Sequence, residues 1–332
     1  MRAYIIGSGV CLPDRVVTNE ELANKLGIDP ERIHKSSGIK QRRWAEPGVL
    51  TSALAARSLE QAIADAKITA NQIDYLLLGT MTPDRFIPGS APAVRTRVGL
   101  REIPCLDIRA ACCNALYALQ LARALILSGA ATRVAICLAE IQSRYLDLSP
   151  ESATLSMLFG DGASALIVSS EPQPGAIEIL DVHLETDGAF ADDLGIRCPG
   201  TEFATAPALC EKSASDFAPR MNGQSVILQA SRRIVAACRA LLERNNLRTQ
   251  EIRWIVPHQA NANLLAQIAR GLAFSRADGV VSVIEDLGNT SSASMGIALD
   301  LLRRARSIER DDYLLMPAFA AGFTWGAALC RA

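Results

Sequence analysis

The fold of this chain is decided by residues 64–80, Ala64-Asp-Ala-Lys-Ile-Thr-Ala-Asn-Gln-Ile-Asp-Tyr-Leu-Leu-Leu-Gly-Thr80, and by residues 243–259, Glu243-Arg-Asn-Asn-Leu-Arg-Thr-Gln-Glu-Ile-Arg-Trp-Ile-Val-Pro-His-Gln259. Each stretch reads as the end of a helix, a polar turn and a short buried strand, with Tyr75 and Trp254 in equivalent places. A helical pattern precedes both, at 53–66 and at 231–244. The two stretches indicate a duplication rather than a chance likeness of two ordinary α/β units.

Further matches follow in the same order along the chain. The apolar strands at 134–139 and 313–318 correspond, and so do the Gly-Ala pairs that lead into strands at 160–168 and 323–331. Strands that alternate with helices predict βαβ units and a mostly parallel sheet. Two copies predict an α/β fold of five layers, α/β/α/β/α, with halves at 1–172 and 173–332. Residues 187–222 lack periodicity and indicate a lid, a binding element or a partly disordered segment.

Composition excludes several classes of protein. The 332 residues are 49% hydrophobic and 21% charged with a net charge of −1, which is typical of a globular protein and gives no basis for binding nucleic acid or an anionic membrane. The chain starts with a strand pattern rather than a signal peptide, and no apolar run reaches the roughly 20 residues that span a bilayer. We therefore expect a cytoplasmic protein.

The nine cysteines form no Cys-x-x-Cys pair, so the spacing predicts neither a metal site nor a disulfide framework. Most of those in apolar runs are expected to fill the core: Cys11, Cys105, Cys137, Cys238 and Cys330.

Cys112 is the best nucleophile candidate. It lies where the strand-like residues ending at Ile108 give way to a helical pattern that begins near Leu116. Unpaired N–H groups and the dipole at the start of a helix favour a thiolate over a thiol. Its neighbour Cys113 points in a different direction and is expected to be a core residue.

Two other strand ends carry polar side chains that match Cys112. His258 follows the strand 254–256, and Asn289 precedes the helical pattern 295–304. Each residue alone has an ordinary structural interpretation: a small core cysteine, a buried histidine, and an asparagine in a turn that caps a helix. Ligands in α/β sheets bind beyond the carboxyl ends of the strands, so the three together predict one reactive cleft.

These residues stand in motifs that resemble the β-ketoacyl-acyl-carrier-protein synthase III group of the thiolase superfamily, and the resemblance covers nearly the whole chain. The motifs are Asp107-Ile-Arg-Ala-Ala-Cys112, Phe159-Gly-Asp-Gly-Ala163, Met221-Asn-Gly223, Val256-Pro-His-Gln-Ala-Asn261, Leu287-Gly-Asn-Thr-Ser291 and Phe319-Ala-Ala-Gly-Phe-Thr-Trp-Gly-Ala-Ala-Leu329.

The resemblance implies a decarboxylative Claisen condensation in fatty-acid or polyketide initiation. Cys112 is then the nucleophile that takes an acyl group from acyl-CoA. His258 and Asn289 hold the thioester carbonyl of malonyl-acyl-carrier protein, and the backbone N–H groups of Cys112 and Ala321 form the oxyanion hole. The family usually has glycine where Ala320 and Ala321 stand. No metal or other cofactor is implied, because coenzyme A and the carrier protein enter as substrates.

The resemblance also implies partners. The enzyme is expected to be a homodimer in which Ile87 of the partner subunit closes the acyl pocket, and Arg270 is expected to face the acidic acyl carrier protein. The basic helix at 231–244 is a second docking candidate, although such a run of arginines is more often the solvated side of an amphipathic helix.

The chain departs from the family where coenzyme A is clamped. The family's Trp position is Arg32, and its arginine positions are Ser36, Ser152 and Asn263. Neutral side chains cannot replace a guanidinium on phosphate. The nearby candidates to take over are Arg42, Arg43 and Arg144. The acyl donor is therefore open: a coenzyme A thioester, another thioester or a group borne by a carrier protein.

Two alternatives remain beside condensation. An acyltransferase of the same fold that passes the Cys112-bound acyl group to a non-malonyl acceptor in specialised metabolism is favoured by the weakened clamp and the 187–222 segment, and opposed by Asn289. A scaffold that has kept only the fold is opposed by the complete Cys112, His258 and Asn289 set.

Overall fold

The computed structural model describes residues 1–201, 217–276 and 278–332. Its strands are β1 Tyr4–Cys11, β2 Val16–Thr18, β3 Gln41–Arg43, β4 Tyr75–Gly79, β5 Cys105–Ile108, β6 Arg133–Glu140, β7 Gly162–Ser169, β8 Ile177–Thr186, β9 Leu194–Gly195, β10 Arg220–Met221, β11 Ile252–Ile255, β12 Tyr313–Ala320 and β13 Thr324–Arg331.

Its α-helices are α1 Asn19–Leu26, α2 Pro30–Ser37, α3 Thr51–Asp65, α4 Ala91–Val98, α5 Asn114–Leu127, α6 Ala153–Ser156, α7 Gly223–Arg244, α8 Ala262–Gly271, α9 Ile284–Leu287 and α10 Ser294–Arg304. Short 3-10 turns include η2 Ala111–Cys113, η3 Gln142–Tyr145, η5 Gly188–Asp193 and η9 Ser291–Ala293.

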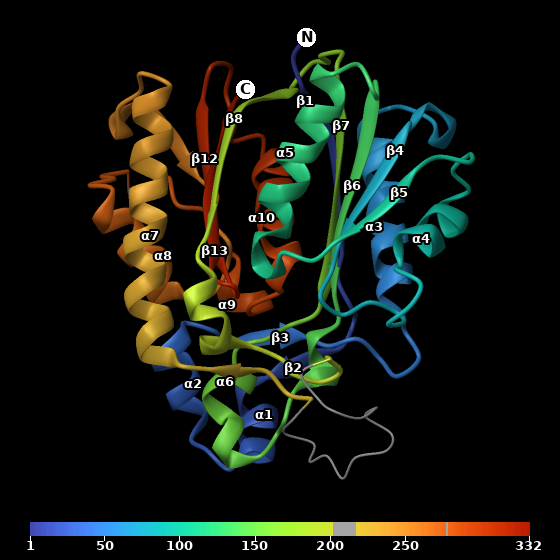
Figure 1. Cartoon of the computed structure of the whole chain (residues 1–332). Helices are drawn as coiled ribbons and strands as arrows, with labels where there is room; N and C mark the ends of the chain where they lie inside the picture. The colour runs from blue at the N-terminus through green and yellow to red at the C-terminus, as the bar shows by residue number, and fades with distance from the viewer. Residues whose placement is uncertain (202–216, 277) are drawn as a thin grey trace.

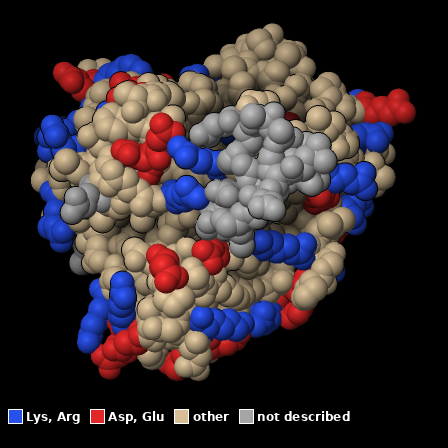
Figure 2. Space-filling model, turned by 60° about the horizontal axis from the view of Figure 1, so that its bottom comes forward, with Lys and Arg blue, Asp and Glu red and all other residues tan. Residues whose placement is uncertain are grey.

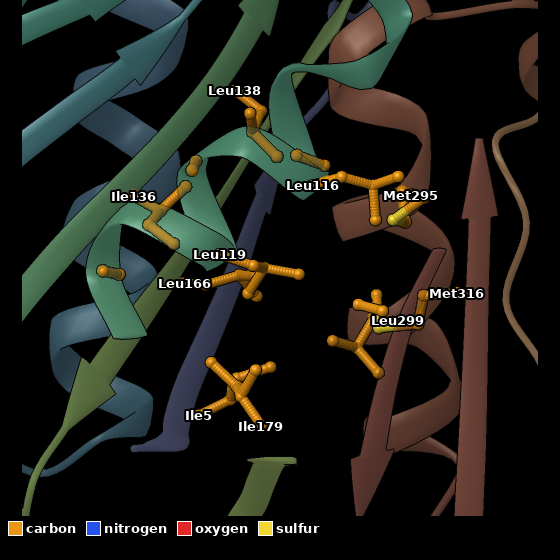
Figure 3. Close-up of a cluster of buried hydrophobic side chains, with 14 of the residues drawn as sticks. Ile5, Leu116, Leu119, Ile136, Leu138, Leu166, Ile179, Met295, Leu299 and Met316 are labelled. Carbon is orange, nitrogen blue, oxygen red and sulfur yellow. The ribbon is translucent and has the colours of Figure 1, made fainter. Parts of the chain in front are cut away.

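The elements form the five layers that the sequence predicts (Figure 1). Helices α7 and α8 cover one outer face and α3 and α4 cover the other, while α5 and α10 lie between the two groups of strands. The buried faces of the central helices are mostly apolar because both sides of this layer are covered. Figure 3 shows their core contacts, where Leu116 and Leu119 of α5 and Met295 and Leu299 of α10 lie with β-strand side chains such as Ile5.

The strand order confirms the duplication. The large sheet runs β11-β12-β13-β8-β1-β7-β6-β4-β5. Read outward from its middle, β8-β13-β12-β11 repeats the arrangement of β1-β7-β6-β4. The two groups are joined by a short antiparallel pairing in which Tyr4 and Ile5 face Glu178 and Ile177. The boundary at 172/173 falls in the connection between β7 and β8, and it stays a prediction.

The expectation of a mostly parallel sheet is wrong. Within the described residues, the ladders β4/β5, β4/β6 and β11/β12 are parallel, and the other five of the large sheet are antiparallel. The reason is visible at β12 and β13, which are separated only by residues 321–323. So short a connection allows only antiparallel pairing, whereas a parallel pair needs a crossover of a dozen or more residues.

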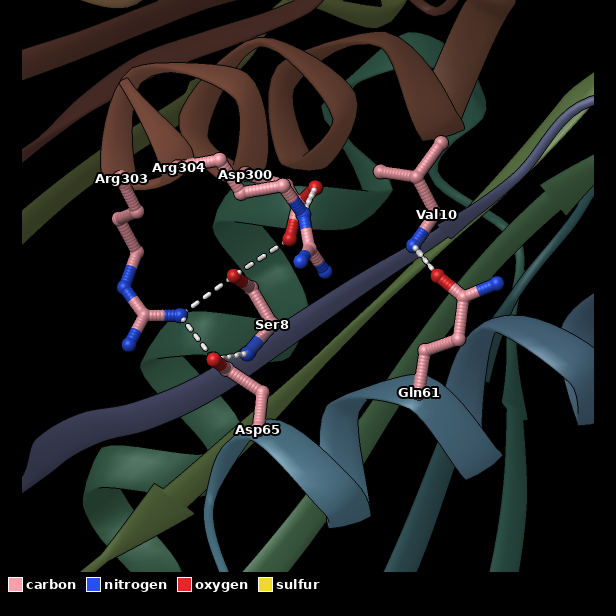
Figure 4. Close-up of polar contacts among 7 residues, drawn as sticks. All are labelled: Ser8, Val10, Gln61, Asp65, Asp300, Arg303 and Arg304. Carbon is pink, nitrogen blue, oxygen red and sulfur yellow. Dashed lines mark hydrogen bonds and ion pairs between the residues drawn. The ribbon is translucent and has the colours of Figure 1, made fainter. Parts of the chain in front are cut away.

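A polar network ties the two halves together across β1 (Figure 4). The Ser8 hydroxyl donates to buried Asp300 of α10 at 2.7 Å, and the Ser8 N–H donates to Asp65 of α3 at 2.9 Å. Arg303 pairs with Asp65 at 2.6 Å, and Arg304 pairs with Asp300 at 2.6 Å. The network therefore fixes α3 and α10 relative to the same strand.

The segment 187–222 has some regular structure. It begins with η5, and β9 pairs with β10 in a small antiparallel sheet. The remainder of this expectation, residues 202–216, lies outside the described residues. Among the helices that the structure describes, none combines the length and the apolar character needed to cross a bilayer.

Candidate active site

Cys112 lies in the sharp turn η2 that joins β5 to α5. The turn depends on Ala111, which has φ of 49°, a left-handed conformation that is uncommon for a residue with a side chain. The side chain of buried Asn114 accepts the Ala110 N–H at 2.6 Å and holds the start of the helix in place. Cys112 is left partly exposed, whereas Cys113 is fully buried and its thiol points to the Thr324 carbonyl at 3.4 Å. The expectation that Cys113 is a core residue is confirmed.

His258 follows β11 and is buried. Its N–H donates to the Pro317 carbonyl at 2.9 Å, which fixes the backbone beside β12. Nδ1 lies 2.8 Å from the Ser294 hydroxyl, which also accepts the Gln259 N–H at 3.1 Å. Burial lowers the pKa of His258 to about 4, so the imidazole is neutral near pH 7. A Ser294 hydroxyl that donates to Nδ1 leaves Nε2 as the ring atom that carries the proton.

Asn289 is held between α9 and η9 by backbone contacts to the Phe159 segment. Its N–H donates to the Leu158 carbonyl at 2.8 Å, and its carbonyl accepts the Gly160 N–H at 3.0 Å. Its Oδ1 accepts the Ser291 N–H at 2.8 Å, so the side chain presents its amide N–H groups as donors.

Two glycines make this approach of the two segments possible. A Cβ on Gly160 would lie 2.2 Å from the Leu287 carbonyl oxygen. Gly288 has φ of +64° and a Cβ there would lie 2.9 Å from the Leu158 carbonyl oxygen. The glycines of both motifs are therefore explained by backbone contact.

The three predicted site residues meet at one segment, residues 289–294. Asn289 begins it, the Ser291 hydroxyl lies 3.5 Å from Cys112 Sγ, and the Ser294 hydroxyl contacts His258. The turns η2 and η9 pack against each other, and β12 packs against η2. The sequence did not predict the contacts of Ser291 and Ser294 with Cys112 and His258, because a Thr-Ser-Ser-Ala-Ser run is typical of the start of a helix.

The expectation of a thiolate at Cys112 is not supported. Removal from water raises the pKa of Cys112 to about 11, the Ser291 hydrogen bond opposes this, and the negative charge of Glu140 adds to it. Desolvation is the largest of these effects, and a pKa of about 11 makes the thiol the favoured form near pH 7. Acylation then requires a group that takes up the thiol proton.

The predicted oxyanion donor Ala321 lies at the turn after β12, beside the segment that contacts η2 and Cys113. Ala320 and Ala321 both lie outside the positive-φ region, so the alanine side chains meet no left-handed strain. The departure from the family's glycine is tolerated by the backbone. The role of the Ala321 N–H in the oxyanion hole stays a prediction.

Most of the cysteines have the structural role that was expected. Cys11, Cys137, Cys238 and Cys330 are buried free thiols, and Cys105 is half-buried. In the described part of the chain, no cluster of three or more His, Cys, Asp or Glu side chains has an arrangement that suits a metal ion.

Comparison with known proteins gives a consistent result. Residues 106–188 match the family described as 3-oxoacyl-(acyl-carrier-protein) synthase III, and residues 242–332 match the C-terminal part of the same family. A β-ketoacyl-acyl-carrier-protein synthase III of Streptomyces coelicolor is 37% identical over 331 residues, which are 98% of this chain and 96% of that protein. The chain belongs to the 3-oxoacyl-acyl-carrier-protein synthase III family.

Solved structures of this synthase III family share the whole fold. The 3-oxoacyl-acyl-carrier-protein synthase III of Aquifex aeolicus superposes with a TM-score of 0.90 at 31% identity, covering 99% of this chain and 100% of that one. The priming β-ketosynthase of a polyketide biosynthetic pathway gives a TM-score of 0.90 at 29% identity, covering 99% and 96%. The thiolase-like fold class is therefore confirmed.

Three positions that the resemblance assigns to arginines of the coenzyme A clamp, Ser36, Ser152 and Asn263, carry neutral side chains, and two of them contact each other. The Asn263 amide donates to the Ser36 carbonyl at 2.9 Å, joining α8 to α2. The Ser152 hydroxyl donates to Asp147 at 2.7 Å, and Arg32 is exposed. These side chains provide no guanidinium fork at the family's arginine positions.

Of the three arginines expected to compensate, Arg42 is excluded. It is fully buried and donates to Asn19 Oδ1 at 2.8 Å and to the Met157 carbonyl at 2.9 Å, and burial lowers its pKa to about 10. Arg43 is half-buried and donates to the Asp14 carbonyl at 2.9 Å. Arg144 is exposed, donates to the Glu46 carbonyl at 3.0 Å, and stays the candidate of the three.

The residues predicted to face partners lie on the surface. Ile87 is 78% exposed and Phe86 is 68% exposed, in the loop that precedes α4. Arg270 is exposed in the last turn of α8. Figure 2 shows the end that carries α1, α2 and α6, where basic and acidic side chains are interspersed.

The arginines of the basic helix α7 mostly serve the fold. Arg233 pairs with Asp187 at 2.7 Å and stacks 4.3 Å from the Trp325 ring, Arg239 donates to the Gly271 carbonyl at 2.7 Å, and Arg244 pairs with Asp181 at 2.7 Å. These contacts favour the structural interpretation of this helix over the docking interpretation.

Proposed function

We propose that this protein catalyses the decarboxylative Claisen condensation of a Cys112-bound acyl group with malonyl-acyl-carrier protein, giving a β-ketoacyl thioester that starts a fatty-acid or polyketide chain. The observation that carries the proposal is the meeting of Cys112, His258 and Asn289 at segment 289–294, with the imidazole neutral. The names of its relatives, β-ketoacyl-acyl-carrier-protein synthase III and priming β-ketosynthase, agree with it.

The first half-reaction is acylation. The Cys112 sulfur attacks the thioester carbonyl of acyl-CoA, a tetrahedral intermediate forms, and coenzyme A leaves as its thiolate. The N–H groups of Cys112 and Ala321 stabilise the oxyanion. The packing of β12, which ends one residue before Ala321, against the turn η2 that carries Cys112 supports this assignment.

The second half-reaction is decarboxylation and carbon–carbon bond formation. His258 Nε2 and the Asn289 amide donate to the thioester carbonyl of the malonyl group, where negative charge develops as carbon dioxide leaves. Neutral donors suit this step because they stabilise the enolate without delivering a proton to its carbon. The enolate carbon then attacks the acyl carbonyl and Cys112 departs.

The proposal includes a homodimer. Strand β5 is at the edge of the large sheet and offers unpaired backbone groups to a second strand. Phe86 and Ile87 expose large apolar side chains, which a partner subunit would cover, with Ile87 reaching the acyl pocket across the interface. Arg270 would contact the acidic carrier protein. No metal or cofactor enters these steps, and free cysteines suit a reducing cytoplasm.

Intact-protein mass spectrometry after exposure to a panel of acyl-CoA thioesters tests the first half-reaction. We expect one acyl group on Cys112 and none on the Cys112→Ala variant. Malonyl-acyl-carrier protein is then added, and carbon dioxide and β-ketoacyl product are measured. An acyl-enzyme that releases no carbon dioxide but transfers its acyl group to a hydroxyl or amine acceptor would replace the proposal with the acyltransferase alternative.

A further inference from the structure

A buried carboxylate lies beneath the nucleophile, and the mechanism above does not use it. Glu140 is the last residue of β6 and is wholly buried. It accepts hydrogen bonds from the Met81 N–H at 3.1 Å, the Thr82 hydroxyl at 2.9 Å and the Ser292 hydroxyl at 2.7 Å. Among the described residues, no lysine, arginine or histidine forms an ion pair with it.

One hydroxyl connects this carboxylate to Cys112. Ser291 Oγ lies 3.5 Å from Cys112 Sγ and 3.4 Å from Glu140 Oε1. Ser291 has φ of 49°, an uncommon conformation that places its hydroxyl between the two groups. The contacts are long, as is common for catalytic hydrogen bonds before substrate binds. The contacts Sγ–Oγ and Oγ–Oε1 therefore connect the thiol to the carboxylate through one hydroxyl.

The electrostatics explain why such a line is needed. Burial, with a smaller contribution from the charge of Glu140, raises the pKa of Cys112 to about 11. A thiolate beside an ionised Glu140 would put two negative charges side by side in this site. Passing the thiol proton to the carboxylate moves one charge from oxygen to sulfur and adds none. Burial raises the pKa of Glu140 to about 7, so the carboxylate is able to take and release a proton near neutral pH.

We propose that Ser291 and Glu140 form a proton relay in which the carboxylate takes up the Cys112 thiol proton during acylation and returns it when the condensed product leaves. This rests on the proposed function. Ser291 touches the reacting sulfur, and Glu140 acts only through Ser291.

The proton balance closes over the cycle. On acylation the Cys112 S–H bond breaks, its proton passes to Ser291 Oγ, and the Ser291 proton passes to Glu140 Oε1. The sulfur forms a bond to the acyl carbon, and coenzyme A leaves as a thiolate that takes a proton from water. After the enolate attacks, the C–S bond breaks, and the Cys112 thiolate regains its proton through Ser291 from Glu140.

The other groups around Glu140 do not provide a competing titration near pH 7. The hydroxyls of Thr80 and Thr82 and the amide of Gln142 face it and do not ionise there. Tyr145 of η3 is the other titratable neighbour, and burial and the Glu140 charge raise its pKa, while Arg109 and Arg144 lower it.

The test is the pH profile of Cys112 alkylation by iodoacetamide in the full-length protein, followed by mass spectrometry of the Cys112 peptide. In the wild type the rate is expected to rise as Glu140 ionises near pH 7 and then to reach a plateau. The change of slope near pH 7, where the rise gives way to the plateau, is called the break. In Glu140→Gln and in Ser291→Ala the break is expected to disappear. The alkylation rate at pH 7.5 should be at least tenfold lower than in the wild type, and it should keep rising with pH.

Ser292→Ala is the matched control, because Ser292 contacts Glu140 but not Cys112. The relay predicts that this variant keeps the break and moves it to higher pH, since the Ser292 hydrogen bond lowers the pKa of Glu140. A break retained in Glu140→Gln or in Ser291→Ala, or absent from the wild type, overturns the relay. Because iodoacetamide needs no acyl donor, failure of acylation by acyl-CoA refutes the proposed function without affecting this result.

Discussion

Replacing Ser294 with alanine should separate the two half-reactions. The Ser294 hydroxyl contacts His258 Nδ1 at 2.8 Å and the Gln259 N–H at 3.1 Å, and it is completely buried. The variant leaves two buried polar groups without their partner, each at a cost of about 1–3 kcal/mol. We expect the His258 ring to lose its fixed orientation and proton position, while Cys112 keeps its surroundings.

The expected loss of rate is obtained by assigning the cost of one lost hydrogen bond to the transition state of decarboxylation. A loss of about 1–3 kcal/mol corresponds to about a 5-fold to 150-fold lower rate at roughly 1.4 kcal/mol per factor of ten. The rate to measure is carbon dioxide release from malonyl-acyl-carrier protein with enzyme that has been acylated beforehand. The rate of Cys112 acylation should remain within about twofold of the wild type.

Ser164→Ala is the control for local packing. Ser164 is also completely buried and donates to the Ala293 carbonyl at 3.0 Å, next to Ser294, but the structure gives it no contact with His258. A Ser294→Ala enzyme that releases carbon dioxide at the wild-type rate would refute the positioning of His258 by Ser294. An equal loss in both half-reactions, or the same loss in Ser164→Ala, would show that the effect is structural.

Two other predictions concern stability and the donor. Between pH 8 and pH 5 the wild type should lose about 2 kcal/mol of unfolding free energy through His258, because the unfolded imidazole gains a proton and the buried one, with a pKa of about 4, does not; urea titrations of His258→Asn should show a flatter pH dependence, and identical slopes would contradict it. Arg42→Ala should lower the free energy of unfolding by about 2–4 kcal/mol and leave the KM for acyl-CoA unchanged, since Arg42 is buried against Asn19 and Met157. Arg144→Ala should raise that KM without changing the Tm. The reverse pattern would show that Arg42, and not Arg144, binds the phosphates of coenzyme A.

The fold was predictable because the duplicated pattern of helix, turn and strand is a local signal. The layers and the pairing of the halves follow from it, and the matched strands β4 and β11 lie at corresponding places in the sheet. Strand direction was not predictable, because it depends on the length of the connections at β12 and β13 rather than on periodicity. The burial of Arg42 was hidden for a similar reason: it is the inward residue of β3, while its neighbours Gln41 and Arg43 are half-exposed.

The site was predictable as far as single residues carry chemistry. Cys112, His258 and Asn289 are recognisable by residue type and by their places at strand ends. Their environment is not, because a pKa depends on burial and on neighbours distant in sequence. Glu140 lies 28 residues after Cys112 in the sequence, at the end of an apolar strand. It is connected to the nucleophile through Ser291.

The duplication also explains how the nucleophile and its neighbours come together. In the first half, Ala111 with φ of 49° precedes Cys112, and α5 begins three residues after it at Asn114. In the second half, Ser291 with the same φ of 49° precedes Ser292, and α10 begins three residues after it at Ser294.

The chain therefore contains the same uncommon turn twice, and the two turns pack against each other. The first turn carries the thiol at its second position. The second carries hydroxyls at its first, second and fourth positions, which contact Cys112, Glu140 and His258 respectively. The same backbone turn thus supplies the nucleophile from one half of the chain and, from the other half, the hydroxyls that contact Cys112, Glu140 and His258. Substitutions in the second turn should consequently leave the first turn in place: Ser291→Ala should alter the reactivity of Cys112, and Ser294→Ala should alter only the step that uses His258.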